Sequence, residues 1–301
     1  MNEGSFTPLP EGSQIGRYRV SKVLEAQRFT ILYRAMDEQG VDLTIEEFAP
    51  WELAQRYPGR DQIEVGGGNQ YYRVGYYCFR EEWCALSKMD HRNLVRVLDV
   101  ISANETVYLV RHYEVGRALG EFISCARDSG SKLERNMRKT VLPEDFVRHV
   151  MLQVLDGLEQ LHRSRMQHMN LSVHSIFVRT DQSVVLHGIG GARRNLFRAL
   201  LKDDLLDAGF TSPELYMRDG RASELGDIYS LGACMLDCMA MSGAGLFVTR
   251  LLNAEILLRT LEQLRGHYSA ALISLVGRCL SLDQAGRPQS VDEVRRGLAT
   301  V

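Results

Sequence analysis

The residues of this sequence that could bind a metal ion or act as nucleophiles lack the spacings that such chemistry needs. The six cysteines form no C-x-x-C pair; they are Cys78, Cys84, Cys125, Cys234, Cys238 and Cys279. Cys234 and Cys238 lie on one face of a predicted helix, but no histidine or carboxylate pair accompanies them, so we interpret them as small core residues. The remaining histidines also lack metal-ligand spacing; among them are His91, His112, His149 and His174. The sequence therefore predicts no metal site, and its unpaired thiols indicate a reducing, cytoplasmic compartment.

The composition is that of a globular protein with enough residues for two cores. The chain has 301 residues, of which 45% are hydrophobic and 25% are charged, which excludes global disorder. Its formal net charge of -2 gives no general attraction to nucleic acid or anionic lipid. Residues 1–16 have neither a basic start nor an apolar run, so we expect a flexible leader and no signal peptide. The most apolar stretch, 228–248, contains Asp237 and predicts a buried helix, without membrane insertion.

Hydrophobic periodicity predicts a sheet first and helices afterwards. Strands are expected at residues 18–24, 30–35, 41–48, 95–101 and 107–113. A Gly- and Tyr-rich insertion of about residues 51–78 is expected to be irregular, and helical spacing follows over 79–89. The second half predicts helices at 143–162, 224–241, 251–264, 270–280 and 291–298. A Ser290–Glu293 capping box begins the last of these helices.

A series of short motifs then resembles a known family. TIEEFAP is similar to the third strand of a group of bacterial Ser/Thr protein kinases, and FREEWCALSKMDHRNLVRVLDV to their helix C region. In the order expected for that family there follow YLVRHYEVG, LHRSRMQHMNLSVHSIFV, VVLHGIGGARR, TSPEL and GDIYSLGACM. The resemblance covers about residues 17–300. It implies an α+β, bilobal protein kinase-like fold, with a sheet-containing N-lobe at 17–112 and a helical C-lobe at 113–301.

The resemblance implies that the phosphate-binding positions have been replaced. Glu25, Gln27 and Thr30 stand where the family has the three glycines of its phosphate-covering loop. These side chains remove the close backbone approach and add a negative charge near the phosphates. The phosphate-pairing lysine is replaced by Glu46, which would face Glu82 of helix C. Two acids then replace the family's ion pair.

The positions for proton transfer and metal binding are replaced too. Asn170 stands at the catalytic base and Ser172 at the lysine two positions later. Ser175 and Gly188 stand at the two metal-binding positions. An amide does not accept a proton at neutral pH, and loss of a general base costs about a hundredfold to ten-thousandfold in rate. The resemblance therefore implies a pseudokinase, with no enzymatic activity, no cofactor and no metal.

The positions that keep a kinase folded are retained. His168 and Asp227 match the pair that anchors the catalytic loop to the central helix, and Glu214 and Arg287 match the ion pair of the lower lobe. The replacements thus affect the positions for phosphate binding, proton transfer and metal binding, and not those that hold the fold together.

Two replacements near the adenine site allow two interpretations each. Arg111 stands at the usually apolar gatekeeper position. It could bridge Glu46 and Glu82, or its stem could pack while its head reaches solvent. Phe177 could fill the adenine slot, or its ring could point into the core of the lower lobe.

Two basic segments could dock a partner protein. Residues 127–139 could do so, or form a solvated loop. Residues 193–202 could form a docking helix, or a helix whose apolar stripe packs on its own lobe. The candidate docking residues of this second segment are Arg193, Arg194, Leu196, Phe197, Arg198, Leu200 and Leu201.

Taken together, the residues predict a catalytically silent domain that acts as a protein-binding scaffold or allosteric regulator in bacterial signalling. The partner would be an active kinase, a phosphatase or another signalling protein. The alternative is a divergent nucleotide-binding transferase with a rearranged metal site, which retained Mg²⁺ ligands would support. A nucleotide sensor without turnover is a third hypothesis, disfavoured by the missing glycines and lysine.

Overall fold

The computed structural model describes residues 6–66, 69–133, 142–200, 209–217, 220–240 and 254–299, and for 127–133, 193, 197–200 and 254 it describes the backbone alone. The chain divides into two units. The first comprises the described residues of Met1–Asp90, Val95–Glu114 and Gly191–Leu205. The second comprises those of His91–Leu94, Val115–Gly190 and Leu206–Val301. The first unit is thus not continuous in sequence, because the described residues 191–200 also belong to it.

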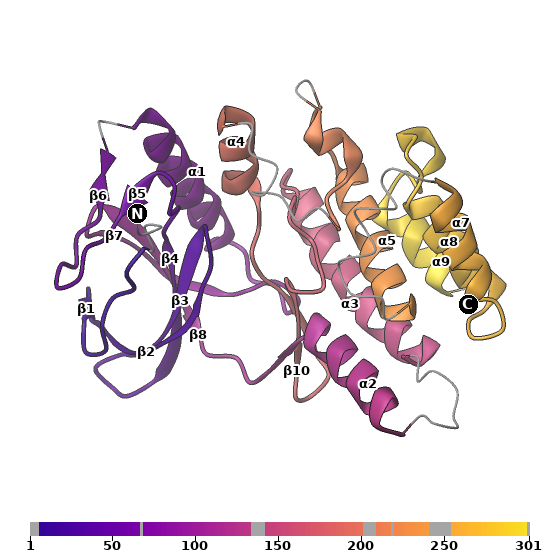
Figure 1. Ribbon diagram of the computed structural model, residues 1–301, viewed down its shortest axis with the longest axis horizontal. Helices are drawn as coiled ribbons and strands as arrows, with labels where there is room; N and C mark the ends of the chain where they lie inside the picture. Colours follow the sequence, from indigo (N-terminus) through magenta and orange to yellow (C-terminus); the bar gives the residue numbers. More distant parts are fainter. Residues whose placement is uncertain are drawn as a thin grey trace. The chain divides into compact units, whose positions relative to one another are not determined.

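The first unit contains a six-stranded antiparallel sheet in the order β1-β2-β3-β4-β8-β7 (Figure 1). Its strands are β1 (Gln14–Ile15), β2 (Tyr18–Ala26), β3 (Thr30–Met36), β4 (Asp42–Phe48), β7 (Val97–Ala103) and β8 (Thr106–His112). The turn between β3 and β4 is closed by Asp37, whose Oδ1 accepts hydrogen bonds from the backbone N–H groups of Gln39 and Val41, both at 2.9 Å. The five strands expected from periodicity are confirmed, with ends shifted by at most two residues.

Both faces of this sheet are buried at the neighbouring strands β4 and β8. In β4 all residues from Leu43 to Phe48 are buried, and in β8 those from Thr106 to Arg111. The N-terminal segment contributes to this burial, because Phe6, Leu9 and Ile15 are each at most 3% exposed. Leu9 also donates its backbone N–H to the hydroxyl of Tyr33 at 3.0 Å. Residues 6–16 are therefore packed and are no flexible leader; three apolar side chains in a polar segment anchor them.

Helix α1 (Gln70–Leu86) starts nine residues earlier than the expected helix at 79. Asn69 caps it, accepting the N–H of Tyr71 through its side chain at 3.0 Å. Its buried residues follow helical spacing: Tyr72, Gly75, Phe79, Trp83 and Leu86. The expectation of an irregular segment up to residue 78 was wrong. The tyrosines and the glycine of this segment have poor helix propensity, but burial of one face of the helix outweighs that propensity. Before the helix, residues 51–66 form only a short ribbon of β5 (Ala54–Gln55) and β6 (Glu64–Val65).

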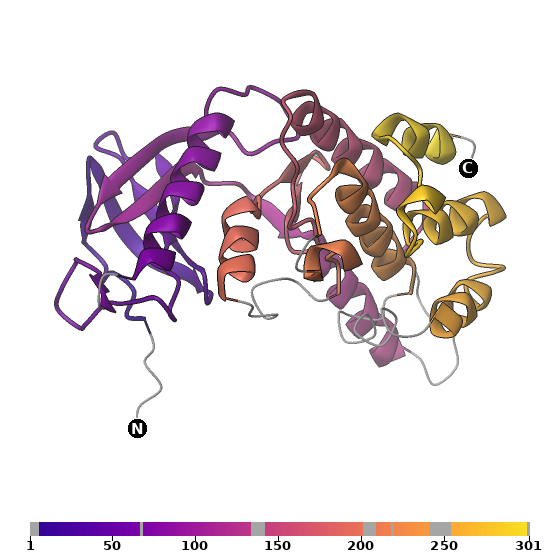
Figure 2. The same cartoon turned by 90° about the horizontal axis from the view of Figure 1, so that it is seen from above.

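The second unit is mainly helical. Its helices are α2 (Leu119–Leu133), α3 (Glu144–Arg163), α5 (Glu224–Ala240), α7 (Ala254–Gln263), α8 (Ala270–Cys279) and α9 (Val291–Ala299), beside a small sheet of β9 (Gly116–Ala118), β10 (Ile176–Arg179) and β11 (Val184–Leu186). Figure 2 shows the same helices from above. Helix α5 is the centre of this unit, since all residues from Gly226 to Met239 are buried. Cys234 and Cys238 lie in this core, as expected.

Helix α2 includes part of the first basic segment. The backbone of residues 127–133 is helical, in α2, so a solvated loop is wrong for that part; Leu119 and Ile123 bury one side of the helix. Residues 134–139 lie outside the described part of the chain. Among the residues that the structure describes, no helix is both long and apolar enough to cross a membrane.

Candidate functional site

In the second unit, residues 168–175 form a loop between α3 and β10 that is held by Asp227 of α5. The carboxylate of Asp227 accepts the backbone N–H groups of His168, at 2.8 Å, and Met169, at 2.9 Å. The structure thus brings together the expected pair of His168 and Asp227, through the backbone. Burial lowers the pKa of the His168 imidazole, so the ring is neutral at neutral pH.

His162 is a further member of this anchor that sequence reasoning missed. Its Nε2 lies 2.8 Å from the same Asp227 carboxylate, and the residue is 8% exposed. A histidine at the buried end of a predicted amphipathic helix, six positions before His168, was the signal that could have found it.

Asn170 and Gly188 lie together in the second unit. The side-chain amide of Asn170 donates to the carbonyl oxygen of Gly188 at 2.9 Å. Gly190 fixes the segment after β11 against this loop, since its N–H donates to the carbonyl of His168 at 2.8 Å. A Cβ on Gly190 would lie 2.3 Å from Cβ of Asn170, so only glycine fits there. The amide is therefore held as a donor against a backbone carbonyl.

Ser172 and Ser175 use their hydroxyl groups to close the same loop. Oγ of Ser175 accepts the N–H of Ser172 at 2.9 Å and donates to the carbonyl of Ser172 at 3.1 Å. Oγ of Ser172 accepts the N–H of His174 at 3.3 Å. Both serines are buried. These hydroxyls are thus engaged in a local turn.

No metal-binding cluster is found in the described ranges: they contain no group of three or more His, Cys, Asp or Glu residues that could hold an ion.

Phe177 lies on β10, opposite Ala118 of β9 and Val185 of β11. Its ring centroid is 5.4 Å from that of His187. A Cβ on Gly116 would lie 2.8 Å from Cε1 of Phe177, so the ring rests on this glycine. These contacts place the ring against the small sheet of the second unit; that it fills an adenine slot stays a prediction.

Glu214 and Arg287 form a buried ion pair in the second unit. The guanidinium donates to both carboxylate oxygens, at 2.7 and 2.9 Å. It also donates to the carbonyl groups of Ser281 and Leu225, at 2.8 and 2.9 Å. Burial acts to raise the pKa of Glu214, but the hydrogen bonds from Arg287 help to outweigh it, and the pKa of this carboxyl is lowered. The two residues expected to tie the lower lobe together are thus in contact.

In the first unit, Glu46 and Arg111 share one face of the sheet. Glu46 is opposite Leu109 and Thr44 is opposite Arg111, so Glu46 and Arg111 are diagonal neighbours on adjacent strands. Each is 8% exposed. Burial lowers the pKa of Arg111, while the negative charges of Glu46 and then Glu114 act in the opposite direction. A cation therefore accompanies the acid at the position where the resemblance places a lysine.

Glu82, the other acid expected to contact Arg111, binds the start of helix α4 (Gly191–Leu200). Its two carboxylate oxygens accept the N–H groups of Gly191 and Ala192, each at 3.1 Å. Figures 1 and 2 show α4 beside α1. A carboxylate at a helix N-terminus satisfies otherwise unpaired donors and interacts favourably with the helix dipole. Glu82 thus holds α4 on α1.

Leu196 of helix α4 packs against α1 in the first unit. Leu196 is fully buried, and a Cβ on Gly75 of α1 would lie 2.8 Å from its Cδ1. Arg194 is 5% exposed. Neither is therefore available to a partner in this structure. Of the other candidate docking residues, Leu201 and the side chains of Arg193, Phe197, Arg198 and Leu200 lie outside what the structure describes.

Replacing Glu82 with Gln should loosen α4. The amide keeps the shape but loses the charge, which is worth about 1 kcal/mol at a helix N-terminus, so local opening should rise roughly fivefold. Hydrogen exchange of the backbone amides of 191–200 measures this. Glu81→Gln is the matched control, because Glu81 is an exposed neighbour on α1. Equal exchange in both variants would contradict the role of Glu82.

The turn between β2 and β3 is closed by one hydrogen bond between side chains and one between backbone groups. Nε2 of Gln27 donates to Oε1 of Glu25 at 2.8 Å, and the N–H of Gln27 donates to the carbonyl of Thr30 at 2.9 Å. Glu25 is exposed, whereas Thr30 is buried. The three residues expected at the glycine positions therefore form one compact turn that carries a carboxylate.

Sequence reasoning missed a buried ion pair on the opposite face of the sheet. The carboxylate of Glu47 binds the guanidinium of Arg56, and both side chains are at most 1% exposed. Tyr33 donates its hydroxyl to Oε2 of Glu47 at 2.6 Å. Arg56 also donates to the carbonyl groups of Asp61, at 2.9 Å, and Thr7, at 3.3 Å. The pair thus joins β4 to the insertion and to the N-terminal segment. The sequence feature that could have indicated this pair is the second glutamate of β4, in a strand whose other residues are mostly buried.

Comparison with known proteins identifies the family. The family model described as "Protein kinase domain" matches residues 75–296, so the chain belongs to the protein kinase domain family. The structure has the bilobal protein kinase fold, with an antiparallel sheet in the N-terminal lobe and a helical C-terminal lobe.

Two solved structures and one curated protein are similar to this chain. The structure titled "PpkA-294 apo form" is similar with a TM-score of 0.80 and 25% identity, covering 97% of this chain and 99% of that one. The PknI kinase domain of Mycobacterium tuberculosis is similar in fold, with a TM-score of 0.70 and 15% identity over 97% and 99% of the two chains. Serine/threonine-protein kinase ICK of Mus musculus is 26% identical over 153 residues, which are 51% of this chain and 22% of that protein. The chain thus spans about a fifth of the length of this curated relative.

Proposed function

We propose that this domain is a catalytically inactive member of the protein kinase family that works by binding a protein partner, as a scaffold or allosteric regulator in bacterial signalling. The observation that carries the proposal is the hydrogen bond from the Asn170 amide to the carbonyl of Gly188. These residues stand where the resemblance places the catalytic base and a metal-binding aspartate. Both positions are therefore neutral, and they are bonded to each other.

The surrounding groups support the same conclusion. Phosphoryl transfer depends on positioning and on neutralising charge with metal ions and a lysine. Ser175, at the other metal-binding position, uses its hydroxyl in a turn with Ser172. Glu46, at the lysine position, is a buried acid that interacts with Arg111. Ser175 and Glu46 thus replace a metal ligand and the lysine, and the positive charge of Arg111 faces the carboxylate of Glu46.

Mg-ATP should not stabilise the protein. A ligand at about a hundred times its dissociation constant would add about 2.7 kcal/mol to the free energy of unfolding. We expect no saturable rise in melting temperature with millimolar ATP and Mg²⁺ or Mn²⁺, compared with the metal alone. A clear, saturable rise that requires the nucleotide would contradict the proposed loss of nucleotide binding.

The partner part of the proposal has a separate test. The domain should enrich a specific signalling protein, such as an active kinase or a phosphatase, when it is used as bait in extracts of its source cell. An active kinase domain of similar size is the control bait. Enrichment of the same proteins by both baits would count against a dedicated partner.

A further inference from the structure

Residues 6–10, which we call the strap, lie outside the helices and strands of the first unit. Their sequence is Phe-Thr-Pro-Leu-Pro and carries no charge. Thr7 and Leu9 each precede a proline, which favours an extended backbone at both positions. Phe6 is 3% exposed and Leu9 is 1% exposed, whereas Pro10 is exposed. The strap is thus an uncharged segment with two anchoring side chains three positions apart.

Tyr33 and Arg56, which we call the strap site, bind the strap mainly through its backbone. The N–H of Leu9 donates to the hydroxyl of Tyr33 at 3.0 Å, and the N–H of Thr7 donates to the backbone carbonyl of Arg56 at 3.4 Å. The guanidinium of Arg56 donates to the carbonyl of Thr7 at 3.3 Å and lies 5.1 Å from the ring centroid of Phe6. Proteins recognise extended peptides by this combination of backbone hydrogen bonds and side-chain anchors.

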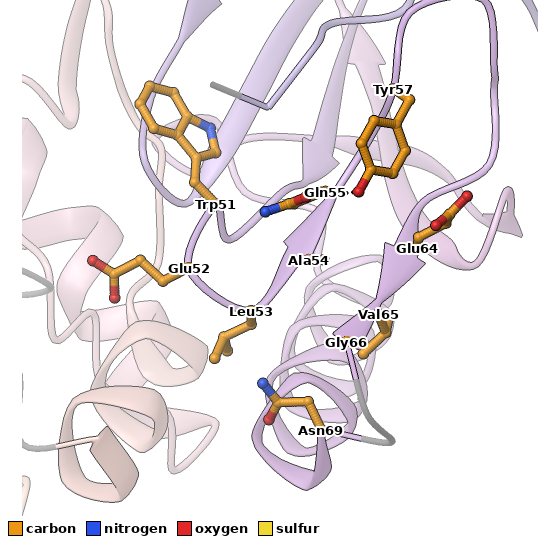
Figure 3. A pocket seen from close by; sticks show the side chains of 10 residues that line it. All are labelled: Trp51, Glu52, Leu53, Ala54, Gln55, Tyr57, Glu64, Val65, Gly66 and Asn69. Atoms are coloured by element: carbon orange, nitrogen blue, oxygen red, sulfur yellow. Dashed lines mark hydrogen bonds between the residues drawn. The ribbon is translucent and has the colours of Figure 1, made fainter. Parts of the chain in front are cut away.

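The strap site is also held by contacts that do not involve the strap. Arg56 directly follows β5, which pairs with β6, and its Nε donates to the carbonyl of Asp61 at 2.9 Å. On either side of Arg56 in sequence, the hydroxyl of Tyr57 donates to Oε1 of Gln55 at 3.1 Å (Figure 3). Tyr33 lies on β3, between β2 and β4 in the sheet. These contacts preorganise the site for an extended segment.

The charges near the strap site compensate each other. Arg56 pairs with the carboxylate of Glu47, and both side chains are at most 1% exposed. Tyr33 donates its hydroxyl to the same carboxylate at 2.6 Å. A further charge buried beside this compensated pair would be costly. The site therefore suits an uncharged segment, as the strap is.

The strap is the part of this contact that opens most easily. Thr7 and Pro8 are half-buried, and a segment with a partly exposed backbone opens at a lower free energy than a core strand. Opening uncovers the apolar surface under Phe6 and Leu9 and removes an acceptor from Arg56. Another segment of the same chemistry would restore both interactions.

We propose that the strap site binds an extended, uncharged segment of a partner protein, which takes the place of the strap. The segment carries an aromatic residue, a leucine three positions later and prolines beside the leucine, because these features let the strap fit. Its backbone accepts a hydrogen bond from Arg56 and donates one to Tyr33. The inference rests on the proposed function and gives the chemistry of the partner. The strap is then an internal competitor for the site.

Fluorescence anisotropy with a labelled peptide of residues 4–12 tests the proposal. The receptor is the full chain with Phe6→Ser and Leu9→Ser, which detaches the strap and leaves the strap site unchanged. We expect saturable binding, at least about tenfold tighter than to the wild type, in which the tethered strap competes at a high effective concentration. A peptide with serine in place of its phenylalanine and leucine should bind at least about tenfold more weakly. Pro10→Ala, a change at an exposed strap residue, is the control receptor and should bind like the wild type.

A second measurement does not depend on the folding of the serine variant. Hydrogen exchange at the amides of Thr7 and Leu9 in the wild type should rise severalfold with millimolar peptide, because the peptide displaces the strap. The serine-substituted peptide should leave this exchange unchanged. A partner enriched by the whole domain should also be released from it by the peptide.

Three results would overturn the proposal: no saturable binding together with unchanged exchange, equal affinity for the serine-substituted peptide, or equal affinity of the variant and the wild type. Light scattering that shows a wild-type dimer, lost in the serine variant, would assign the site to a second copy of the chain and would also overturn it. A partner that the peptide does not release would end this inference and leave the proposed function standing. Phosphate transfer by the domain would overturn the proposed function without changing the measured peptide affinity.

Discussion

Replacing Arg56 with methionine is expected to lower the free energy of unfolding of the first unit by about 3 to 5 kcal/mol, because it leaves the Glu47 carboxylate buried without its cation. Glu47 is fully buried. Its hydrogen bond from the Tyr33 hydroxyl would remain, but that group carries no positive charge. Denaturant unfolding followed by tryptophan fluorescence measures this, since both tryptophans of the chain, Trp51 and Trp83, belong to the first unit.

The matched control for this experiment is Arg60→Met, which removes an exposed arginine from the same insertion and should change stability little. Adding Glu47→Gln to the Arg56 variant should recover part of the loss, because the uncompensated charge is then gone. Equal effects of Arg56→Met and Arg60→Met would show that the buried pair does not hold the insertion and the N-terminal segment.

Replacing Arg111 with methionine is expected to destabilise the same unit by about 3 kcal/mol. The change keeps most of the volume and removes the positive charge beside Glu46, at a site where both residues are 8% exposed. Adding Glu46→Gln should restore part of the stability. Arg34→Met is the control, since Arg34 pairs with Asp42 at the surface of the neighbouring strand. A double-mutant cycle without coupling between positions 46 and 111 would contradict the account.

The sequence predicted the strands and helices whose hydrophobic residues follow one clear periodicity. Strands β2, β3, β4, β7 and β8 and helices α3, α5, α8 and α9 begin and end within two residues of the expected positions. These segments are long, strongly patterned or capped, so local signals agree with tertiary packing. The pairs of His168 with Asp227 and of Glu214 with Arg287 are also found together, because motif order alone places them.

Other features could not be predicted because they depend on contacts between distant segments. Nothing local in residues 6–16 shows that Phe6 and Leu9 pack against the sheet. The early start of α1 depends on burial of Tyr72, which outweighs its weak helix propensity. The binding of Glu82 to the N-terminus of α4, more than a hundred residues away in sequence, has no local signal either. The same holds for Glu47, whose partner Arg56 is visible only in the folded chain.

Phosphate transfer tests the central claim most directly. The wild type and Asn170→Ala should be incubated side by side with radiolabelled ATP, Mg²⁺ or Mn²⁺, and a generic protein substrate. We predict no incorporation into the substrate or into the protein itself above the background without protein, because the base, the cation and the metal ligands are replaced together. Incorporation that persists through purification of the wild type and disappears in Asn170→Ala would contradict the account.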